Sequence, residues 1–279
     1  MGNVVWLASY PKSGNTWLRA FLVNLFRDPG QPLALNVLAG DLVHSESAIG
    51  WYSMLDERPP GTWSDDDIAR MRPKVHELIA RSHDGTVFCK THSALMTIRG
   101  HPAVNMNVSA GAIYVIRNPL DVVISFADFQ GVPLDMAIAM MATDNFEIRA
   151  GGNQVAVALG SWSQHVASWT AADNKMIHIV RYEDMTQAPL KTFGAIGAYL
   201  GLKTPRARLE RAIRSSSFKV LRAQEEKHGF SERSLAQERF FRKGVVDEWR
   251  EVLSEAQARR ITDANREQMA RFGYVPDGF

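Results

Sequence analysis

Little in this 279-residue chain points to a secreted, membrane-spanning or nucleic-acid-binding protein. It has a single cysteine, Cys89, so no internal disulfide can form, and a reducing compartment is expected. Its net charge of +2 and pI near 8.7 are too mild to indicate nucleic acid as the main partner. No apolar run approaches the length of a membrane span, and no basic leader precedes the first apolar segment. We therefore expect a cytoplasmic protein with neither nucleic acid nor membrane as partner.

The motifs of several common enzyme classes are also missing. The chain has no G-x-G-x-x-G fingerprint, no G-x-S-x-G elbow and no G-K-[ST] of a Walker loop. The segment "VHELIARSH" (75–83) lacks the second histidine that a zinc protease needs, and we interpret it as the surface of a helix. The acidic run "SDDD" (64–67) is expected to begin a helix rather than to bind an ion. The sequence thus predicts no metal site.

What the chain does contain is an alternation of short β-branched runs with helical patterns. This alternation predicts an α/β fold, a single domain over 1–279 with a mostly parallel central sheet flanked by helices. The segments 28–65, 128–158 and 222–245 are expected to be acceptor-site or lid insertions, the first and last largely irregular. The predicted strands are 3–9, 86–92, 111–117 and 175–181, and the predicted helices are 16–26, 119–129, 159–172, 190–202 and 254–272.

The first predicted strand and helix are joined by the loop "SYPKSGNTW". Parallel sheets bind ligands beyond the carboxyl ends of their strands, and a helix start presents backbone N–H groups with a positive dipole end. Lys12 adds a cation, and Ser13 and Thr16 add hydroxyl donors, so the loop is suited to a phosphate. The alternative is a plain turn in which Asn15 or Thr16 only caps the helix.

At these residues the chain resembles a known family. "YPKSGNTW" resembles the 5′-phosphosulfate loop of sulfotransferases that use 3′-phosphoadenosine 5′-phosphosulfate (PAPS), usually YPKSGTTW, with Asn15 in place of a threonine. Further segments resemble the family's signatures in the same order, leaving gaps at 28–80 and 128–157. The resemblance implies a P-loop-like strand–loop–helix site whose donor-binding residues are Lys12, Ser13, Gly14, Asn15, Thr16 and Trp17.

Two of the other segments resemble the family's 3′-phosphate motifs. In "YVIRNPLDVVISF" (114–126), Arg117 and Ser125 match the binding positions, and an arginine fork suits a phosphate. The alternative there is a surface pair between Arg117 and Asp121. In "FFRKGVVDEWREVLS" (240–254), the resemblance assigns phosphate contacts to three residues, whose alternative role is a basic patch on a solvated helix start: Arg242, Lys243 and Gly244. Asp247 and Glu248 depart from the family's usual Gly-Asp.

Adenine contacts are implied for Tyr182 in "VRYEDM" and Phe218 in "SSSFKVL", together with Trp17. An aromatic ring stacked on a base contributes about 1–3 kcal/mol. Each of these rings, judged singly, is equally consistent with the hydrophobic core.

The segment "FCKTHSAL" (88–95) resembles the family's K-T-H segment, in which the histidine is the general base. His92 would take the acceptor proton, since an ordinary histidine pKa near 6.5 suits that task. Lys90 would stabilise the sulfuryl oxygens and Lys12 the leaving phosphate, while Ser125 would restrain Lys12. A buried structural role for His92 is the alternative.

The sequence therefore predicts a PAPS-dependent sulfotransferase that transfers a sulfuryl group to the hydroxyl of a small-molecule acceptor by in-line displacement, without a metal. The alternatives are a nucleotide-dependent phosphotransferase and a non-catalytic protein that binds PAPS or its product PAP. In the gap after Phe129, the chain is more similar to bacterial sulfotransferases that modify natural products than to animal phenol or steroid enzymes. The methionine-rich segment 136–146 is either part of an acceptor pocket or a core helix. The oligomeric state is open.

Overall fold

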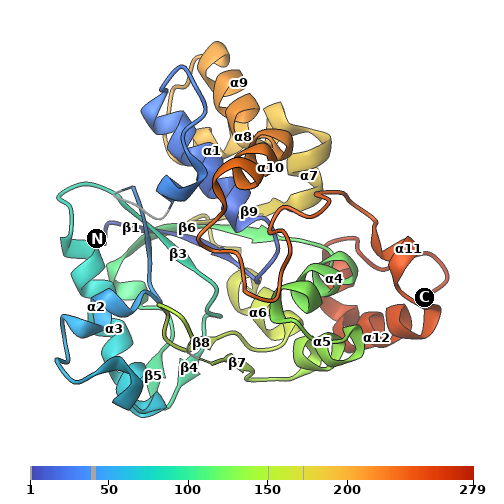
Figure 1. Cartoon of the computed structure of the whole chain (residues 1–279), viewed down its shortest axis with the longest axis horizontal. Helices are drawn as coiled ribbons and strands as arrows, with labels where there is room; N and C mark the ends of the chain where they lie inside the picture. The colour runs from blue at the N-terminus through green and yellow to red at the C-terminus, as the bar shows by residue number, and fades with distance from the viewer. Residues whose placement is uncertain (1, 39–41, 150, 172) are drawn as a thin grey trace. The chain divides into compact units, whose positions relative to one another are not determined.

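The computed structural model describes residues 2–38, 42–149, 151–171 and 173–279 (Figure 1). Its strands are β1 (Val4–Ser9), β2 (Val43–Ser45), β3 (Val87–Thr91), β4 (Thr97–Ile98), β5 (His101–Pro102), β6 (Ser109–Ile116), β7 (Glu147–Ile148), β8 (Val157–Ala158) and β9 (Ile177–Arg181). Its α-helices are α1 (Asn15–Arg27), α2 (Ile49–Ser53), α3 (Asp65–Arg81), α4 (Pro119–Gln130), α5 (Leu134–Ala142), α6 (Trp162–Thr170), α7 (Tyr182–Gln187), α8 (Pro189–Tyr199), α9 (Arg206–Ser215), α10 (Phe218–His228), α11 (Trp249–Val252) and α12 (Glu255–Arg271).

A five-stranded sheet has the order β2-β3-β1-β6-β9, and β3 pairs in parallel with both of its neighbours. All six residues of β1 are buried, as expected for a parallel strand covered on both faces. Cys89 in β3 is fully buried, and burial raises the pKa of its thiol well above the ordinary value. The predicted fold, a mostly parallel sheet flanked by helices, is confirmed.

The chain forms two compact units, each assembled from separate stretches. The first comprises residues 1–10, 41–114 and 140–179 and contains β1, β2, β3, α2, α3 and α6. Ser64 and Asp67 form a reciprocal capping box at the start of α3, as the acidic run predicted. Ser161 and Gln164 do the same at the start of α6. The prediction that 1–279 forms one domain remains a prediction.

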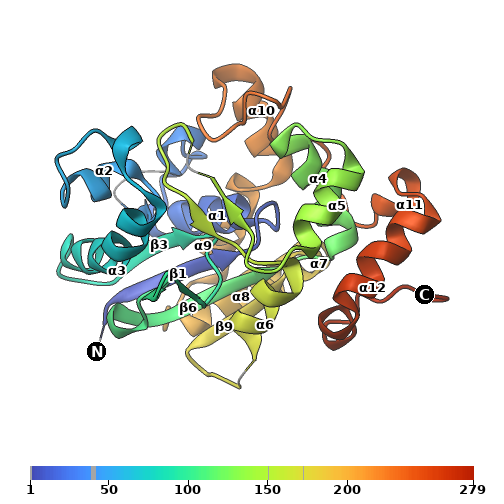
Figure 2. The ribbon, with the colours of Figure 1, turned by 90° about the horizontal axis from the view of Figure 1, so that it is seen from below.

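The second unit comprises residues 11–40, 115–139 and 180–279. Here α1 packs against α9, α9 against α8, and α8 against α7. Helices α11 and α12 pack against α4 (Figure 2). The unit therefore contains the opening loop, the segment after β6 and the late basic segment, which are the three predicted phosphate-binding stretches.

The predicted insertions are more regular than expected. The segment 28–65 contains β2 and α2, and β2 extends the sheet by pairing with β3, so the prediction of irregular chain was wrong there. A three-residue strand has too short a pattern to be recognised, and its pairing with β3 determines its conformation. The segment 222–245 begins inside α10, and 128–158 contains α5. Residues 39–41, 150 and 172 of the predicted segments lie outside the described residues.

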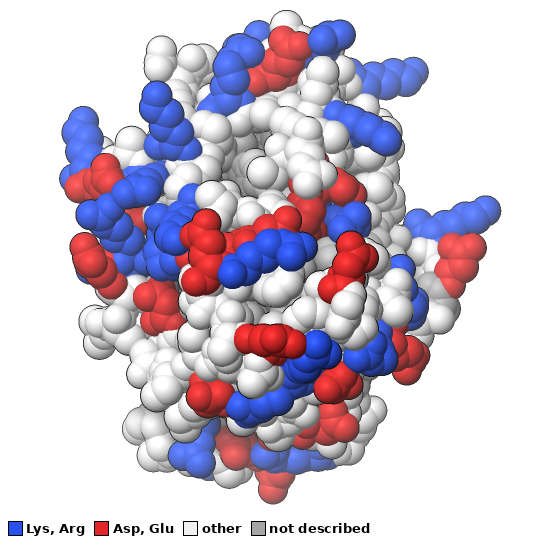
Figure 3. All heavy atoms as spheres, turned by 90° about the vertical axis from the view of Figure 1, so that its right-hand side faces the viewer, with Lys and Arg blue, Asp and Glu red and all other residues white. Residues whose placement is uncertain are grey.

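The described surface is mixed in charge. Figure 3 shows Lys and Arg side chains interspersed with Asp and Glu over one face of the molecule. On α12, Arg259 pairs with Glu255 at 2.8 Å and Arg266 with Asp263 at 2.8 Å. Among the described residues, no single helix has both the length and the apolar character to cross a membrane. The bent pair α4 and α5 together has the length and composition of a span.

Candidate active site

The opening loop has an unusual backbone. Lys12 has φ +67° and Gly14 has φ +106°, both in the left-handed region that favours glycine. Gly14 occupies the N-cap of α1 and provides no side-chain cap, so capping by Asn15 or Thr16 does not explain this loop. A Cβ at Gly14 would lie only 2.8 Å from a ring carbon of Tyr182. The glycine therefore allows the loop to approach that ring.

Two buried donors at this helix start have no hydrogen-bond partner within the described part of the chain. They are the hydroxyl of Ser13 and the indole N–H of Trp17. Buried polar groups in native proteins are almost always satisfied, so such a pair at a helix start favours a polar ligand. The residues present therefore fit the phosphate end of the expected nucleotide.

Arg117 joins the predicted phosphate-binding segments of the second unit. One guanidinium nitrogen donates to the carbonyl oxygen of Lys12 at 3.3 Å, and another donates to that of Val245 at 3.0 Å. The guanidinium also lies over the Tyr182 ring, 4.2 Å from its centroid. Arg117 and Asp121 are 3.9 Å apart, but both are buried, so the surface-pair alternative is wrong.

Asp121 holds the turn at Asp247, which follows the basic residues Arg242 and Lys243. Its carboxylate accepts hydrogen bonds from the backbone N–H groups of Asp247 at 2.9 Å and Trp249 at 3.0 Å. Burial raises the pKa of Asp121 despite these bonds and despite nearby Arg117. Asp247 itself has φ +63°, the left-handed conformation for which the family's pattern supplies a glycine. The turn geometry is thus kept although the glycine is absent.

The late basic residues are held by Glu248. Arg242 donates to this carboxylate at 2.6 Å, and the ammonium of Lys243 lies 3.1 Å from it. Burial tends to raise the pKa of Glu248, but the hydrogen bonds from Arg242 and Lys243 outweigh it and lower that pKa. Gly244 has φ +68°, and a Cβ there would overlap the ring of Phe218. Position 244 therefore needs a glycine to leave room for the Phe218 ring, a reason that could not be predicted from the sequence.

The three predicted adenine-binding aromatics lie in the same unit. The rings of Trp17 and Tyr182 meet edge to face, with centroids 5.7 Å apart. Phe218 packs in the same manner on Phe241 at 6.0 Å. Each ring is therefore linked to a predicted phosphate-binding segment, Tyr182 through Gly14 and Phe218 through Gly244.

Lys12 lies between aromatic rings. Its ammonium is 3.8 Å from the centroid of the Phe240 ring and 4.9 Å from that of Phe129. Cation–π contacts of this kind hold an ammonium without neutralising it. Ser125 and Phe129 are one turn apart on α4 and therefore share a face of that helix. This arrangement is consistent with the predicted proximity of Ser125 and Lys12.

Lys90 and His92 belong to the first unit, at the carboxyl end of β3. Nδ1 of His92 lies 2.8 Å from the carbonyl oxygen of Ser9, the last residue of β1. A carbonyl can only accept, so Nδ1 carries the proton in neutral His92 and the lone pair is on Nε2. His92 and Lys90 are both half-buried. Neutral His92 therefore has the tautomer, with its lone pair on Nε2, that the predicted general base needs.

A buried charged network that sequence reasoning missed fixes the residues around His92. Glu46 accepts hydrogen bonds from the hydroxyls of Thr91 at 3.2 Å and Ser93 at 2.9 Å, and from Arg72 at 2.9 Å. Burial tends to raise the pKa of Glu46, but Arg72 and the hydrogen-bonded neighbours lower it below the ordinary value. His76 lies 3.6 Å from Glu46.

His76 is fully buried, so the interpretation of 75–83 as a helix surface was wrong. Its ring meets the buried Trp6 of β1 edge to face at 4.9 Å. The apolar periodicity of α3 around Val75 and Ile79 was the available signal, since His76 lies on the same buried side. No comparable signal marks Glu46, which lies in a segment without periodicity.

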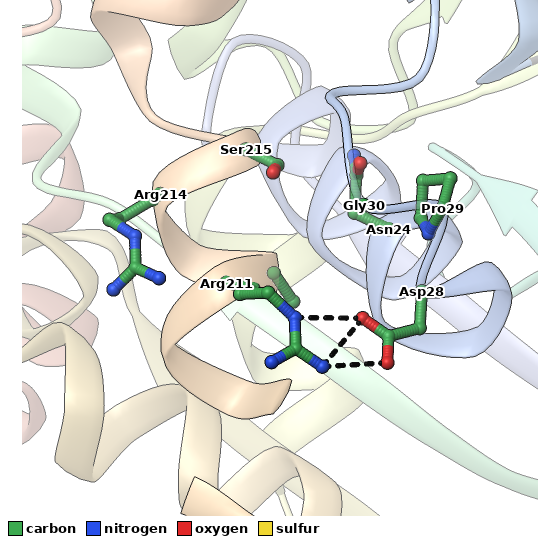
Figure 4. A pocket seen from close by; sticks show the side chains of 8 residues that line it. Asn24, Asp28, Pro29, Gly30, Arg211, Arg214 and Ser215 are labelled. Carbon is green, nitrogen blue, oxygen red and sulfur yellow. Dashed lines mark hydrogen bonds and ion pairs between the residues drawn. The ribbon is translucent and has the colours of Figure 1, made fainter. Parts of the chain in front are cut away.

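One small cavity of the second unit lies apart from these residues. It has a volume of about 180 Å³ and contains an ion pair between Arg211 and Asp28 at 2.8 Å (Figure 4). None of the predicted donor-binding residues lines it; its lining is Asn24, Asp28, Pro29, Gly30, Arg211, Ala212, Arg214 and Ser215. Among the described residues, no group of three or more His, Cys, Asp or Glu side chains is placed to hold a metal ion.

Known proteins resemble this chain over most of its length. Residues 3–273 match the family model described as a sulfotransferase domain. The chain is 26% identical over 275 residues to a 3-beta-hydroxysteroid sulfotransferase of Cavia porcellus, covering 97% of this chain and 84% of that protein. It is 24% identical over 272 residues to sulfotransferase 1C2 of Homo sapiens, covering 94% of this chain and 82% of that protein.

Solved structures share the fold. The mouse sulfotransferase SULT7A1 complexed with PAP aligns with a TM-score of 0.63 at 22% identity, covering 96% of this chain and 84% of that one. A retinol dehydratase in complex with androsterone and inactive cofactor PAP aligns with a TM-score of 0.62 at 18% identity, covering 96% and 80%. The predicted enzyme class, a PAPS-dependent sulfotransferase, is confirmed, and the phosphotransferase alternative is not favoured. Since the family model matches nearly its whole length, this chain belongs to the sulfotransferase family.

Proposed function

We propose that this chain transfers the sulfuryl group of PAPS to a hydroxyl group of a small-molecule acceptor, with the second unit binding the donor and His92 acting as base. One observation carries the assignment of donor residues. Arg117 donates to the backbone of both Lys12 and Val245, so a single guanidinium ties the opening loop to the late basic segment. These are the two segments that the resemblance assigns to opposite ends of the same nucleotide.

Each proposed role follows from the chemistry of its side chain. The donor supplies an activated sulfuryl group. Lys12, whose ammonium lies against the rings of Phe240 and Phe129, stabilises the charge on the leaving phosphate. His92 accepts the acceptor's proton at Nε2, because Nδ1 donates to Ser9. Lys90 stabilises the charge on the sulfuryl oxygens, and Ser125 restrains Lys12.

The late basic residues already have a carboxylate partner, which a bound phosphate would either displace or join. Arg242 and Lys243 both contact Glu248 in this structure, so a 3′-phosphate binds by competing with that carboxylate or by adding to it. The surrounding donors of Ser13, Asn15 and Thr16, with the rings of Trp17, Tyr182 and Phe218, complete the proposed donor site.

The test measures transfer and donor binding separately. Purified protein is mixed with PAPS and a panel of phenols, alcohols and natural products, and products are examined for the mass increment of one SO₃ unit. His92→Ala is expected to abolish transfer while PAP still raises the melting temperature. Arg117→Ala is expected to reduce that thermal stabilisation instead. Normal turnover by His92→Ala would refute the base, and a full thermal shift with Arg117→Ala would refute the donor site.

We propose a cytoplasmic location, supported by the single, buried cysteine. The acceptor is proposed to be a small compound with a hydroxyl group, and more specifically a natural product. Met136 supports an apolar acceptor, since its side chain on α5 is 55% exposed rather than part of the core. The bacterial assignment remains a prediction, since the curated relatives named above are mammalian.

A further inference from the structure

The backbone of the proposed base is held by a second histidine. His165 on α6 is fully buried, and its Nε2 lies 3.1 Å from the carbonyl oxygen of His92. Since a carbonyl only accepts, Nε2 of His165 carries the proton and donates it. Its Nδ1 then accepts from the hydroxyl of Tyr114, which lies 2.9 Å away. The two hydrogen bonds fix one tautomer of His165.

The His165 ring is also held by packing. It stacks on the Tyr114 ring with centroids 5.6 Å apart and meets Tyr10 edge to face at 5.5 Å. Burial lowers the pKa of His165 to about 3, so the ring is neutral wherever the enzyme works. Because this ring is buried and both of its nitrogens are hydrogen-bonded, to Tyr114 and to His92, it cannot reach a substrate proton, but it can hold its hydrogen-bond partner at a constant position.

Residues from α6 bind three successive parts of the segment that carries His92. His165 donates to the carbonyl of His92, Trp169 donates to that of Ser93 at 3.1 Å, and the Ser168 hydroxyl accepts from the N–H of Leu95 at 3.0 Å. The contact made by His165 is the one on the proposed base itself. We expect the loss of this contact to loosen the His92 backbone and so to alter the bond between Nδ1 and Ser9.

We propose that His165 is a positioning residue for sulfuryl transfer: with Tyr114 it fixes the backbone of His92 so that Nδ1 donates to Ser9 and Nε2 faces the acceptor proton. This inference rests on the proposed role of His92 as base. Small displacements of a catalytic group reduce rates about ten- to a hundred-fold. The expected signature is therefore a loss of kcat with donor binding unchanged.

The test uses variants at His165 and a matched control on the same helix. His165→Leu is expected to lower kcat about ten- to a hundred-fold while the thermal shift produced by PAP is retained. His165→Gln, whose amide N–H can still donate to His92, is expected to recover most of the rate. Ala167→Ser changes a half-buried side chain of the same helix outside these three contacts and is expected to leave kcat unchanged. Equal activity of His165→Leu and wild type, or equal losses for the Leu and Gln variants, would overturn the proposal.

A spectroscopic measurement separates this proposal from the function on which it rests. In protein with ¹⁵N-labelled histidine rings at about pH 8, where an exposed histidine is neutral, His92 is expected as the Nδ1–H tautomer. His92→Ala assigns its signal. A mixture of tautomers at His92 is expected in His165→Leu and, to a smaller extent, in Tyr114→Phe, which is the conservative choice should His165→Leu not fold. An unchanged tautomer in a folded variant would contradict the proposal, and this readout requires neither donor nor acceptor turnover.

Discussion

Asp247 shows how a single residue can replace a glycine without changing a turn. Its φ of +63° is unfavourable for most side chains, but aspartate tolerates it better than most. The carboxylate accepts a hydrogen bond from the indole N–H of Trp249 at 3.2 Å, and the backbone N–H donates to Asp121. The side chain therefore offsets part of the backbone strain.

We expect Asp247→Gly to fold with equal or slightly greater stability and to keep its affinity for PAP. Asp247→Ala keeps the strain and loses the hydrogen bond, so a destabilisation of about 1 kcal/mol is expected. Denaturant unfolding of the two variants checks the order of stabilities. An Ala variant as stable as the Gly variant would mean that the left-handed backbone at 247 carries no strain.

Lys12 is the second non-glycine residue with a left-handed backbone in the donor site. Lys12→Met keeps the backbone carbonyl that Arg117 binds and most of the aliphatic chain that lies between Phe129 and Phe240. We therefore expect kcat to fall about a hundred-fold or more, since a charge that stabilises the transition state is lost. The melting-temperature shift produced by PAP should fall by much less than the rate. A variant that loses both in equal measure would show that Lys12 binds the donor rather than assisting the transfer.

At this scale the sequence indicates motif residues better than their partners. Lys12, Arg117 and Arg242 could be proposed as site residues because short motifs carry recognisable chemistry, and their roles remain predictions. Glu46, His165 and Glu248 could not be assigned their contacts, because their partners are distant in sequence and come together only in the fold. Even for Gly244, the reason for the glycine is the ring of Phe218, which no local pattern reveals.

Among the elements, the irregular chain between α10 and α11 is held at several points. The carboxylate of Glu225 accepts from the backbone N–H groups of Phe240 at 2.6 Å and Phe241 at 2.9 Å. Earlier in the same stretch, Glu232 receives two hydrogen bonds at 2.7 Å from the buried Arg19 of α1. Between these attachments, Leu235 is fully exposed. The stretch is thus an anchored loop rather than a free one.

We expect Glu232→Gln to loosen this loop. The substitution leaves the Arg19 guanidinium buried without a charged partner; because the Glu232 side chain is 18% exposed, we expect a cost below the roughly 3–5 kcal/mol of a fully buried pair. Limited proteolysis near Leu235 should therefore accelerate. Glu238→Gln is the matched control, since Glu238 is exposed and its pair with Arg239 is at the surface. Equal cleavage rates for the two variants would mean that Arg19 does not hold the loop.

The longer strands of the central sheet could be predicted, whereas β2 and the helices α9 and α10 were not. The four predicted strands correspond to β1, β3, β6 and β9. β1, β3 and β6 are mostly buried, and a strand covered on both faces is a continuous apolar run. β2 has three residues and no such run. Its position depends on pairing with β3 and on Glu46, which follows it and binds Thr91 and Ser93.

For the molecule as a whole, buried histidines set a dependence of stability on pH. Burial lowers the pKa of His165 to about 3, and it also lowers the pKa values of His76 and His178. An unfolded histidine has a pKa near 6.5, so below that pH the unfolded chain binds protons that the folded chain does not. The stability that these groups contribute is present above about pH 6.5 and is lost as the pH falls toward their folded values.

We therefore expect the free energy of unfolding to fall between about pH 7 and pH 5. Glu46 has a lowered pKa, but its contribution declines only below the unfolded glutamate value of about 4.3, outside this window. His165→Gln should show a flatter dependence, because glutamine does not titrate. The surface variant His83→Gln should retain the slope of the wild type. Denaturant titrations at several pH values check this, and parallel curves for His165→Gln and wild type would exclude His165 as the source.

The single cysteine has a practical consequence for work on this enzyme. Cys89 is enclosed within β3, and its high thiol pKa keeps the reactive thiolate scarce. A cysteine introduced at Leu235 would therefore be the one site that a maleimide dye modifies in the native protein. Fluorescence from that position could then follow the loop as nucleotide is added, without first replacing the natural residue.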